Sequence, residues 1–213
     1  MKILKSEFFP KLFADFEEAS ENVLVLVQEY VSGRDLFQLI KAKGSKNGLP
    51  EDTCKFYFRQ IIEAVRFMHA NLICHRDLKL ENILVSDRQR VKVIDFGFGI
   101  RTPEDVPLKI FCGTSSYMAP EIVRKSEYNG FKADIWALGV VLYVMLTGRF
   151  PFKAKTEKEL YVRIQTGQFL PPMQINFDAK RLITRMLSVE PSKRPTATEI
   201  LKDSWLTFSR ERV

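Results

Sequence analysis

Residues 75–95 bring together the side-chain types that phosphoryl-transfer chemistry requires. Such a transfer needs a carboxylate that orients the attacking hydroxyl and accepts its proton, a cation beside the moving phosphate, and oxygen ligands for magnesium. Asp77 can serve as the carboxylate, Lys79 as the cation, and Asn82 with Asp95 as the metal ligands. The combined spacing predicts a phosphoryl-transfer site, although any one of these residues alone would be read as a surface or capping residue.

A helix and a hairpin are predicted to position these side chains. Pro50 stands at a helix start, and apolar residues recur at helical spacing as far as Met68. Two apolar runs, 83–85 and 91–94, are separated by a polar turn and predict a β-hairpin that ends at Asp95. We therefore expect a long helix to lead into residues 75–82, and a ribbon to hold Asp95 beside them.

Further elements are predicted on both sides of this site. Apolar and β-branched residues indicate two adjacent strands over 13–16 and 23–28, followed by a helix over 35–43. After residue 121 the pattern is helical, with predicted helices over 132–146, 157–166, 178–187 and 196–205. The back half of the chain should therefore be mainly helical.

Composition limits the class of protein and its partners. With 213 residues of which 46% are hydrophobic, the chain can bury a full core. The net charge is +7, but acidic and basic residues alternate and no nucleic-acid-binding motif occurs, so we expect no nucleic-acid partner. The apolar run 135–146 is shorter than the roughly twenty residues that cross a bilayer, which predicts a core helix and no membrane partner.

The cysteines and histidines suggest the cellular compartment and exclude zinc. Cys54, Cys74 and Cys112 are odd in number and contain no CxxC pair, which is typical of reduced thiols in a cytoplasmic protein, with a nuclear location as the alternative. His69 and His75 have no partners at metal-ligand spacing. His75 has two interpretations, a general base or a structural residue packed under Phe96, and we favour the structural one.

Three ordered motifs resemble those of eukaryotic protein kinases. They are the run from His75 to Asn82, the triplet Asp95-Phe96-Gly97 and the triplet Ala119-Pro120-Glu121. The resemblance is strongest to the calcium/calmodulin-dependent and AMP-activated branch of serine/threonine kinases. It implies an α+β protein-kinase fold, with residues 1–30 as a remnant of the N-lobe and residues 31–213 as the mainly helical C-lobe.

The resemblance assigns roles around the phosphoryl-transfer site. It implies that Asp77 is the catalytic base, that Lys79 faces the γ-phosphate, and that Thr114 bridges these two side chains. Arg76 is the arginine that couples the catalytic loop to the activation segment. Lys79, two positions after Asp77, is the signature of serine/threonine specificity.

ATP and Mg²⁺ are the cofactors that the resemblance implies. Glu29 to Val31 match the hinge whose backbone pairs with adenine, and Leu84 matches the floor of that pocket. Asp35 is placed near the ribose. The magnesium ligands are the same two residues, Asn82 and Asp95, that the chemistry alone indicates.

A protein substrate with a basic residue before its phosphoacceptor is the implied partner; the oligomeric state stays open. Glu81 and Asp35 are the carboxylates that would pair with this basic residue, with solvated surface carboxylates as the alternative interpretation. Phe111 and Met118 match an apolar pocket for the residue after the phosphoacceptor.

Three further residues have structural roles by the same resemblance. Asp134 should hold the backbone of the catalytic loop, and Glu121 should form a buried ion pair with Arg194.

The sequence also departs from the kinase pattern. It contains no GxGxxG loop and no VAIK-type lysine, and alignment places the usual αC glutamate roughly four residues before Met1. Ile110 occupies the position where related kinases often carry an activating phosphothreonine, which leaves Thr102, Ser115 or Ser116 as alternatives. We expect an N-terminally incomplete piece of a working kinase, inactive by itself; the alternative is a catalytically inactive kinase-like scaffold.

Overall fold

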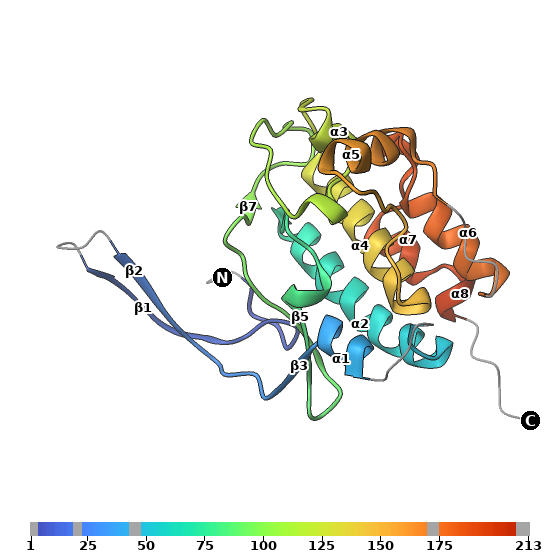
Figure 1. Ribbon diagram of the computed structural model, residues 1–213. Helices are drawn as coiled ribbons and strands as arrows, with labels where there is room; N and C mark the ends of the chain where they lie inside the picture. The colour runs from blue at the N-terminus through green and yellow to red at the C-terminus, as the bar shows by residue number, and fades with distance from the viewer. Residues whose placement is uncertain (1–3, 19–22, 43–47, 170–174, 208–213) are drawn as a thin grey trace, which may run out of the picture.

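The computed structural model describes residues 4–18, 23–42, 48–169 and 175–207 of the chain. Most of these residues form a helical body, with the strands along one side (Figure 1). The helices are α1 (Leu36–Ala42), α2 (Glu51–Ala70), α3 (Pro120–Val123), α4 (Gly130–Thr147), α5 (Glu157–Thr166), α6 (Phe177–Met186), α7 (Ala197–Leu201) and α8 (Ser204–Thr207), with short 3-10 turns η1 (Leu80–Asn82), η2 (Ser115–Tyr117) and η3 (Pro191–Lys193).

The described strands form three small antiparallel sheets, ordered β1-β2, β3-β5-β6 and β4-β7. Helices and antiparallel sheets in separate regions make an α+β fold, as predicted. The strands are β1 (Leu12–Glu18), β2 (Val23–Gln28), β3 (Gly33–Asp35), β4 (Ile73–Cys74), β5 (Ile83–Ser86), β6 (Val91–Val93) and β7 (Ile100–Arg101).

Helix α4 is the centre of the hydrophobic core. The Asn129 side chain caps its first turn by accepting a hydrogen bond from the Lys132 N–H at 3.0 Å, and Gly148 ends it with a left-handed φ of 67°. Within the described part of the chain, α4 is the one helix long and apolar enough to cross a membrane, but 89% of that stretch is buried in the fold. The prediction of a core helix here is confirmed.

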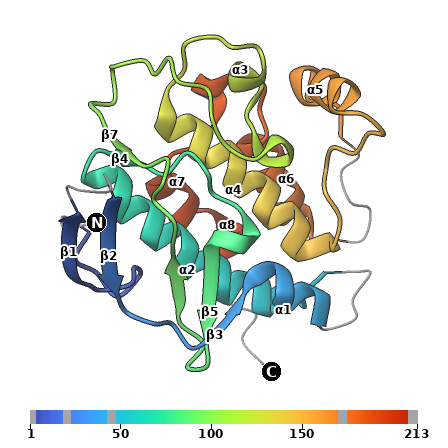
Figure 2. The same cartoon turned by 60° about the vertical axis from the view of Figure 1, so that its left-hand side comes forward.

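Helix α2 runs beside α4 and leads the chain into the catalytic loop, residues 75–82 (Figure 2). Its buried residues recur three and four apart, from Phe58 through Ile61, Ile62 and Val65 to Met68, so one face packs on the core. Loop and hairpin then follow as predicted. Strand β5 pairs with β6, and the backbone N–H of Ile94 donates to the Asn82 carbonyl at 3.0 Å, which ties the end of the ribbon to the loop.

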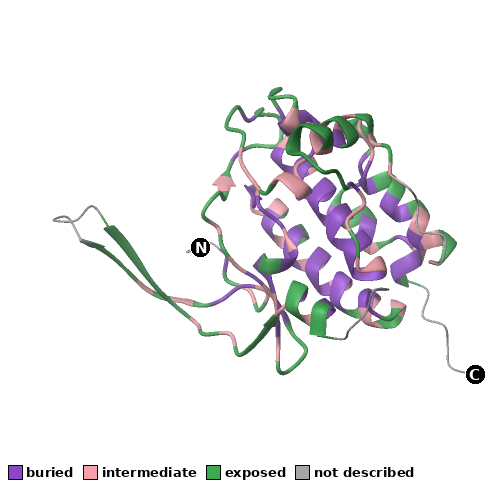
Figure 3. Ribbon diagram, viewed as in Figure 1, coloured by how far each residue is buried: buried purple, intermediate pink, exposed green. Residues whose placement is uncertain are grey.

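The β1–β2 hairpin projects away from the helical body (Figure 1). Its strands pair only with each other within the described chain, and every residue of β2 is exposed (Figure 3). Both strands were predicted, and both form, but no layer covers either face among the described residues.

One predicted helix is interrupted. The helical stretch expected over 196–205 consists of α7 and α8, separated at Lys202 and Asp203. The Asp203 carboxylate accepts a hydrogen bond from the Trp205 N–H at 3.0 Å and pairs with Arg181 of α6, also at 3.0 Å. Asp203, held by Arg181 of α6, thus interrupts the helix, and α8 begins after it at Ser204.

Candidate active site

Hydrogen bonds from Thr114 and Lys79 fix the Asp77 carboxylate. Its Oδ1 accepts from the Thr114 backbone N–H at 3.0 Å and from the Thr114 hydroxyl at 2.8 Å, while its Oδ2 accepts from the Lys79 ammonium at 2.7 Å. Lys79 also donates to Thr114 Oγ1 at 3.1 Å, which closes a ring of three side chains. Asp77 is 6% exposed, so water competes little for these contacts.

Asp134 of α4 anchors the backbone of the catalytic loop. One carboxylate oxygen accepts from the His75 N–H and the other from the Arg76 N–H, both at 2.9 Å. Arg76 has a left-handed φ of 67°, which costs a non-glycine residue about 1–3 kcal/mol. The paired hydrogen bonds from a buried helix residue hold the loop in this strained conformation.

His75 is a structural residue by its contacts. Its Nε2 lies 2.9 Å from the Ile94 carbonyl and therefore carries the hydrogen, while Nδ1 accepts from the Asp77 N–H at 3.3 Å. The ring lies 4.8 Å from the Phe96 ring, as the structural interpretation predicted. Complete burial lowers the pKa of the imidazole, which favours the neutral form. Both nitrogens are thus used in positioning.

Asn82 and Asp95 offer oxygen ligands on neighbouring segments. The Asn82 side-chain nitrogen donates to the Asp77 carbonyl at 2.9 Å and to its carboxylate at 3.3 Å, so the amide oxygen points the other way. Asp95 is exposed, with a left-handed φ of 61°, and one of its oxygens accepts from the Gly97 N–H at 3.1 Å. The described residues contain no group of three or more His, Cys, Asp or Glu that could hold a metal ion. Two oxygen ligands still fit Mg²⁺, which is usually bound by one or two protein oxygens together with substrate phosphates.

The residues predicted to contact a protein substrate lie around the same loop. Glu81 is exposed, and one of its oxygens lies 3.5 Å from the Tyr117 hydroxyl. Burial and the Glu81 charge raise the pKa of Tyr117, which therefore stays protonated. Phe111 is partly exposed and Met118 is half-buried, so an apolar surface is available beside the Thr114 end of the site.

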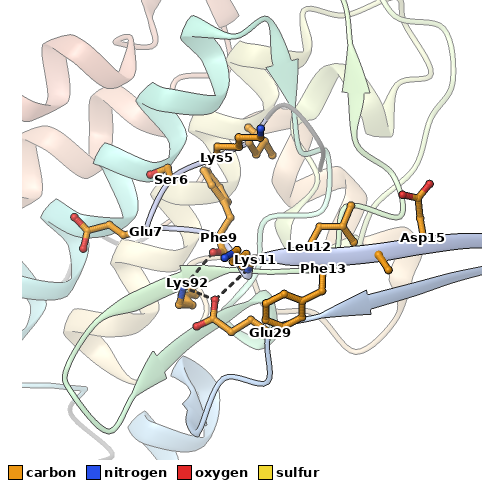
Figure 4. A pocket seen from close by; sticks show the side chains of 12 residues that line it. Lys5, Ser6, Glu7, Phe9, Lys11, Leu12, Phe13, Asp15, Glu29 and Lys92 are labelled. Atoms are coloured by element: carbon orange, nitrogen blue, oxygen red, sulfur yellow. Dashed lines mark hydrogen bonds and ion pairs between the residues drawn. The ribbon is translucent and has the colours of Figure 1, made fainter.

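Of the residues predicted to bind nucleotide, Glu29 is the one that lines the cavity between the N-terminal segment and β6. Glu29 lines a cavity of about 770 Å³ together with Phe9, Leu12 and Lys92, whereas Leu84 and Asp35 are not part of its wall (Figure 4). Asp35 is half-buried and caps α1 by accepting from the Gln38 N–H at 2.7 Å.

Glu29, at the start of the predicted hinge, is joined to the residue before β1 and to β6, the strand that leads to Asp95. Its carboxylate accepts from the Lys11 N–H and from the Lys92 ammonium, each at 3.0 Å (Figure 4). The hydrogen bond from the Lys11 N–H is the main cause of the lowered pKa of Glu29. Val31 and Leu84 are each half-buried.

Comparison with known proteins settles the family. Residues 1–206 match the family described as protein kinase domain. The chain belongs to the protein kinase family. It is 40% identical over 205 residues to a probable serine/threonine-protein kinase of Dictyostelium discoideum, which covers 96% of this chain and 24% of that protein. It is 40% identical over 209 residues to CBL-interacting protein kinase 12 of Oryza sativa, covering 96% of this chain and 38% of that one.

A third similar protein is also a serine/threonine-protein kinase. The serine/threonine-protein kinase SIK3 homolog of Danio rerio is 39% identical over 206 residues, covering 97% of this chain and 17% of that protein. The chain thus spans well under half the length of the curated relatives it matches. The predicted likeness to serine/threonine kinases of the calcium/calmodulin-dependent and AMP-activated branch is confirmed.

Glu121 and Arg194 form a two-pronged ion pair inside this kinase fold. The two guanidinium nitrogens of Arg194 lie 2.6 and 2.7 Å from the two oxygens of Glu121. Arg194 also donates to the Ser188 and Lys132 carbonyls and lies over the Trp136 ring. The pair therefore joins the end of the activation segment to the helical body.

One contact of the kinase site was not predicted. Ser115 of η2 donates to the Glu157 carboxylate of α5 at 2.7 Å, and Tyr161 donates to the same oxygen at 2.8 Å. Glu157 lies in the first turn of a helix, where an acidic residue is common for electrostatic reasons. No local signal in the sequence distinguishes this tertiary contact from ordinary helix capping.

Proposed function

We propose that this protein transfers the γ-phosphoryl group of ATP to serine or threonine hydroxyls of protein substrates. The main support is the Asp77 carboxylate, fixed by Lys79 and Thr114 in the catalytic loop. An oriented, ionised carboxylate can align the acceptor hydroxyl and take its proton. Lys79, held beside it, supplies the positive charge that stabilises the transferred group.

Asn82 and Asp95 are the residues that would hold Mg²⁺ in this proposal. Their amide and carboxylate oxygens are the hard ligands that this ion prefers. When bound, Mg²⁺ would neutralise charge on the phosphate oxygens. The chain's own contribution is to keep both oxygen ligands in fixed positions relative to Asp77, through the bonds from Asn82 to Asp77 and from Ile94 to Asn82.

The preferred substrate, we infer, carries a basic residue before the phosphoacceptor and an apolar one after it. Glu81 is exposed beside the catalytic loop and can pair with a basic side chain. Asp35 contributes less, because one of its oxygens already caps α1. Phe111 and Met118 offer apolar surface on the other side of the acceptor position.

A pair of matched variants tests the assigned roles. Residues 1–213 contain no glycine-rich phosphate loop, so we expect measurable transfer only from a chimera that places such a loop and a lysine-bearing strand before Met1. In this chimera Asp77→Asn should lower kcat about 10²- to 10⁴-fold and leave the affinity for Mg-ATP nearly unchanged, since the base contacts the acceptor hydroxyl.

Asp95→Asn should instead weaken Mg-dependent nucleotide binding as well as transfer. Nucleotide affinity is measured by calorimetry with and without Mg²⁺, and transfer with a radiolabelled γ-phosphate. Equal nucleotide affinity in the two variants would contradict the division of roles. Full activity of the Asp77→Asn chimera would contradict the proposed base.

A further inference from the structure

Tyr128 connects the activation segment to the start of α4. Its backbone N–H and carbonyl pair with the carbonyl and N–H of Leu108 at 3.1 and 2.8 Å, which forms an isolated antiparallel bridge. Its hydroxyl donates to the Ile110 carbonyl at 2.9 Å, and its ring lies 6.2 Å from the Phe111 ring. Tyr128 is 3% exposed. Tyr128 thus contacts the activation segment at three positions, Leu108, Ile110 and Phe111.

The neighbours of Tyr128 add contacts to the same segment. The Asn129 side chain caps α4 through its oxygen and donates through its nitrogen to the Glu104 carbonyl at 2.9 Å. Lys109 and Glu127 form an ion pair at 3.0 Å, but both are well exposed, so this pair contributes little. The buried and capping contacts of Tyr128 and Asn129 therefore dominate.

The Arg76 guanidinium of the catalytic loop lies close enough to Tyr128 to act on its hydroxyl. Burial raises the pKa of Tyr128, and the nearby Arg76 guanidinium acts against this rise. Arg76 Nε donates to the Phe98 carbonyl at 2.6 Å, while its Nη1 is buried without a hydrogen-bond partner in the described part of the chain. The Arg76 guanidinium and the Tyr128 phenol thus each donate a hydrogen bond to a backbone carbonyl of the activation segment, Phe98 and Ile110 respectively.

The first part of the activation segment, residues 96–112, has little opportunity to be ordered by phosphorylation. Between Asp95 and Gly113 the only hydroxyl side chain is that of Thr102. Thr102 is 6% exposed, and its hydroxyl faces the Pro103 carbonyl. The Ile110 side chain is 66% exposed and offers no atom for a charged contact. A phosphate on this stretch is therefore not what orders it, and its buried contacts, those of Tyr128 and Asn129 among them, contribute more than the exposed Lys109–Glu127 pair.

The short stretch from Ile110 to Thr114 connects the ordered part of the activation segment to the residue that binds the Asp77 carboxylate. Thr114 follows Ile110 by four positions, and the intervening Gly113 has a φ of 116°. A Cβ on Gly113 would lie 2.9 Å from the Arg76 carbonyl, so the segment passes directly against the catalytic loop here. Fixing the Ile110 carbonyl limits where Thr114 can lie.

We propose that Tyr128 is a positioning residue whose hydroxyl holds the activation segment against Arg76 and the catalytic loop, so that Thr114 reaches Asp77 without phosphorylation of the segment. The proposal concerns the order of the segment and stands whether or not the chain transfers phosphate. It goes beyond the proposed function, because it assigns the ordering of the active site to a residue outside that site.

Amide hydrogen exchange tests this proposal on the phosphatase-treated 213-residue chain, with loss of phosphate verified by mass spectrometry. Tyr128→Phe keeps the ring and removes only the hydroxyl. We expect the Thr114 and Leu108 amides to exchange about three- to tenfold faster in this variant, as loss of one hydrogen bond predicts. Tyr57→Phe is the matched control, because Tyr57 is also a buried phenol, 4% exposed, with its hydroxyl on Gln89. Its Thr114 exchange should equal that of the wild type.

A second comparison tests the link to Arg76. Arg76→Ala, Tyr128→Phe and the double variant form a cycle, and the effects on Thr114 exchange should be clearly less than multiplicative if the two side chains act together. Multiplicative effects would overturn the link, and unchanged Thr114 exchange in Tyr128→Phe would overturn the proposal. If Tyr128→Phe does not fold, the same exchange measurement is made on the phosphate-free wild-type chain. A Thr114 amide that exchanges there as fast as in an unfolded peptide would also overturn the proposal.

Discussion

His75 shows how one buried side chain makes the catalytic loop sensitive to acid. Burial lowers the pKa of its imidazole below the unfolded value, about 6.5, so the unfolded chain binds the proton more readily. Stability is therefore full above about pH 6.5 and is lost as the pH falls below it, at up to about 1.4 kcal/mol per pH unit. Protonation would also place a hydrogen on Nδ1, which now accepts from the Asp77 N–H.

We therefore predict that wild type and His75→Phe converge in stability as the pH falls from 7 to 5. The variant loses the two hydrogen bonds but cannot titrate, so its disadvantage should shrink in acid. Urea unfolding at several pH values measures the difference in the free energy of unfolding. A difference that stays constant over this range would contradict the buried, neutral imidazole.

Which residues meet near the catalytic loop could be predicted from the sequence, because their contacts are local or follow a fixed motif. Asp77, Lys79 and Asn82 lie within one short loop, and their mutual contacts follow from its conformation. Contacts such as Ser115 with Glu157 could not be predicted, because they join elements far apart in the chain and each residue has an ordinary local explanation. The same holds for the Tyr128 hydroxyl and the Ile110 carbonyl.

The pairing of α3 with the chain before α7 depends on one buried ion pair. Glu121 lies in the first turn of α3, and Arg194 follows η3; the Arg194 side chain is completely buried and that of Glu121 nearly so. Removing one partner leaves an uncompensated buried charge, which typically costs about 3–5 kcal/mol. Replacing both by apolar residues removes that penalty.

We predict that Arg194→Met lowers the free energy of unfolding by about 3–5 kcal/mol, and that Arg194→Met with Glu121→Leu recovers part of this loss. Lys193→Met is the matched control, since its neighbouring pair with Glu190 is exposed and should leave stability nearly unchanged. Chemical denaturation measures all four chains. A double variant less stable than Arg194→Met would argue against a charge penalty.

At the same scale, most helices were predicted well, including the short α1, α5 and α6, and the predictions missed α3 and the break between α7 and α8. Helices α2 and α4 follow directly from their patterns of buried residues. The break between α7 and α8 escaped prediction because Asp203 acts through Trp205 and through Arg181 on α6, and a side chain from another helix leaves no periodic signal in the sequence.

For the whole molecule, the sequence predicts a helical body that carries the site and a hairpin that does not belong to its core. The helical body follows from composition and periodicity. The direction of the β1–β2 hairpin does not, because within the described chain no tertiary contact of β2 outside β1 defines it. Its two strands are specified by β-branched residues, and its position only by the connections at each end.

The exposed β1–β2 hairpin leads us to predict that the chain associates with itself. Val23, Leu24, Val25, Leu26 and Val27 are each between 41% and 59% exposed, so β2 presents apolar side chains on both of its faces, and the whole strand is exposed (Figure 3). An uncharged, unpaired strand edge is a template for pairing with another chain. We expect the chain to associate increasingly with concentration, and Leu24→Lys with Leu26→Lys to suppress this by placing charges on the exposed strand. Phe177→Ser is the control, because Phe177 is 78% exposed on α6, away from the hairpin, and its loss should change nothing. Light scattering over a range of concentrations measures the mass, and a wild-type chain that stays monomeric at the highest concentration would show that the exposed ribbon does not pair.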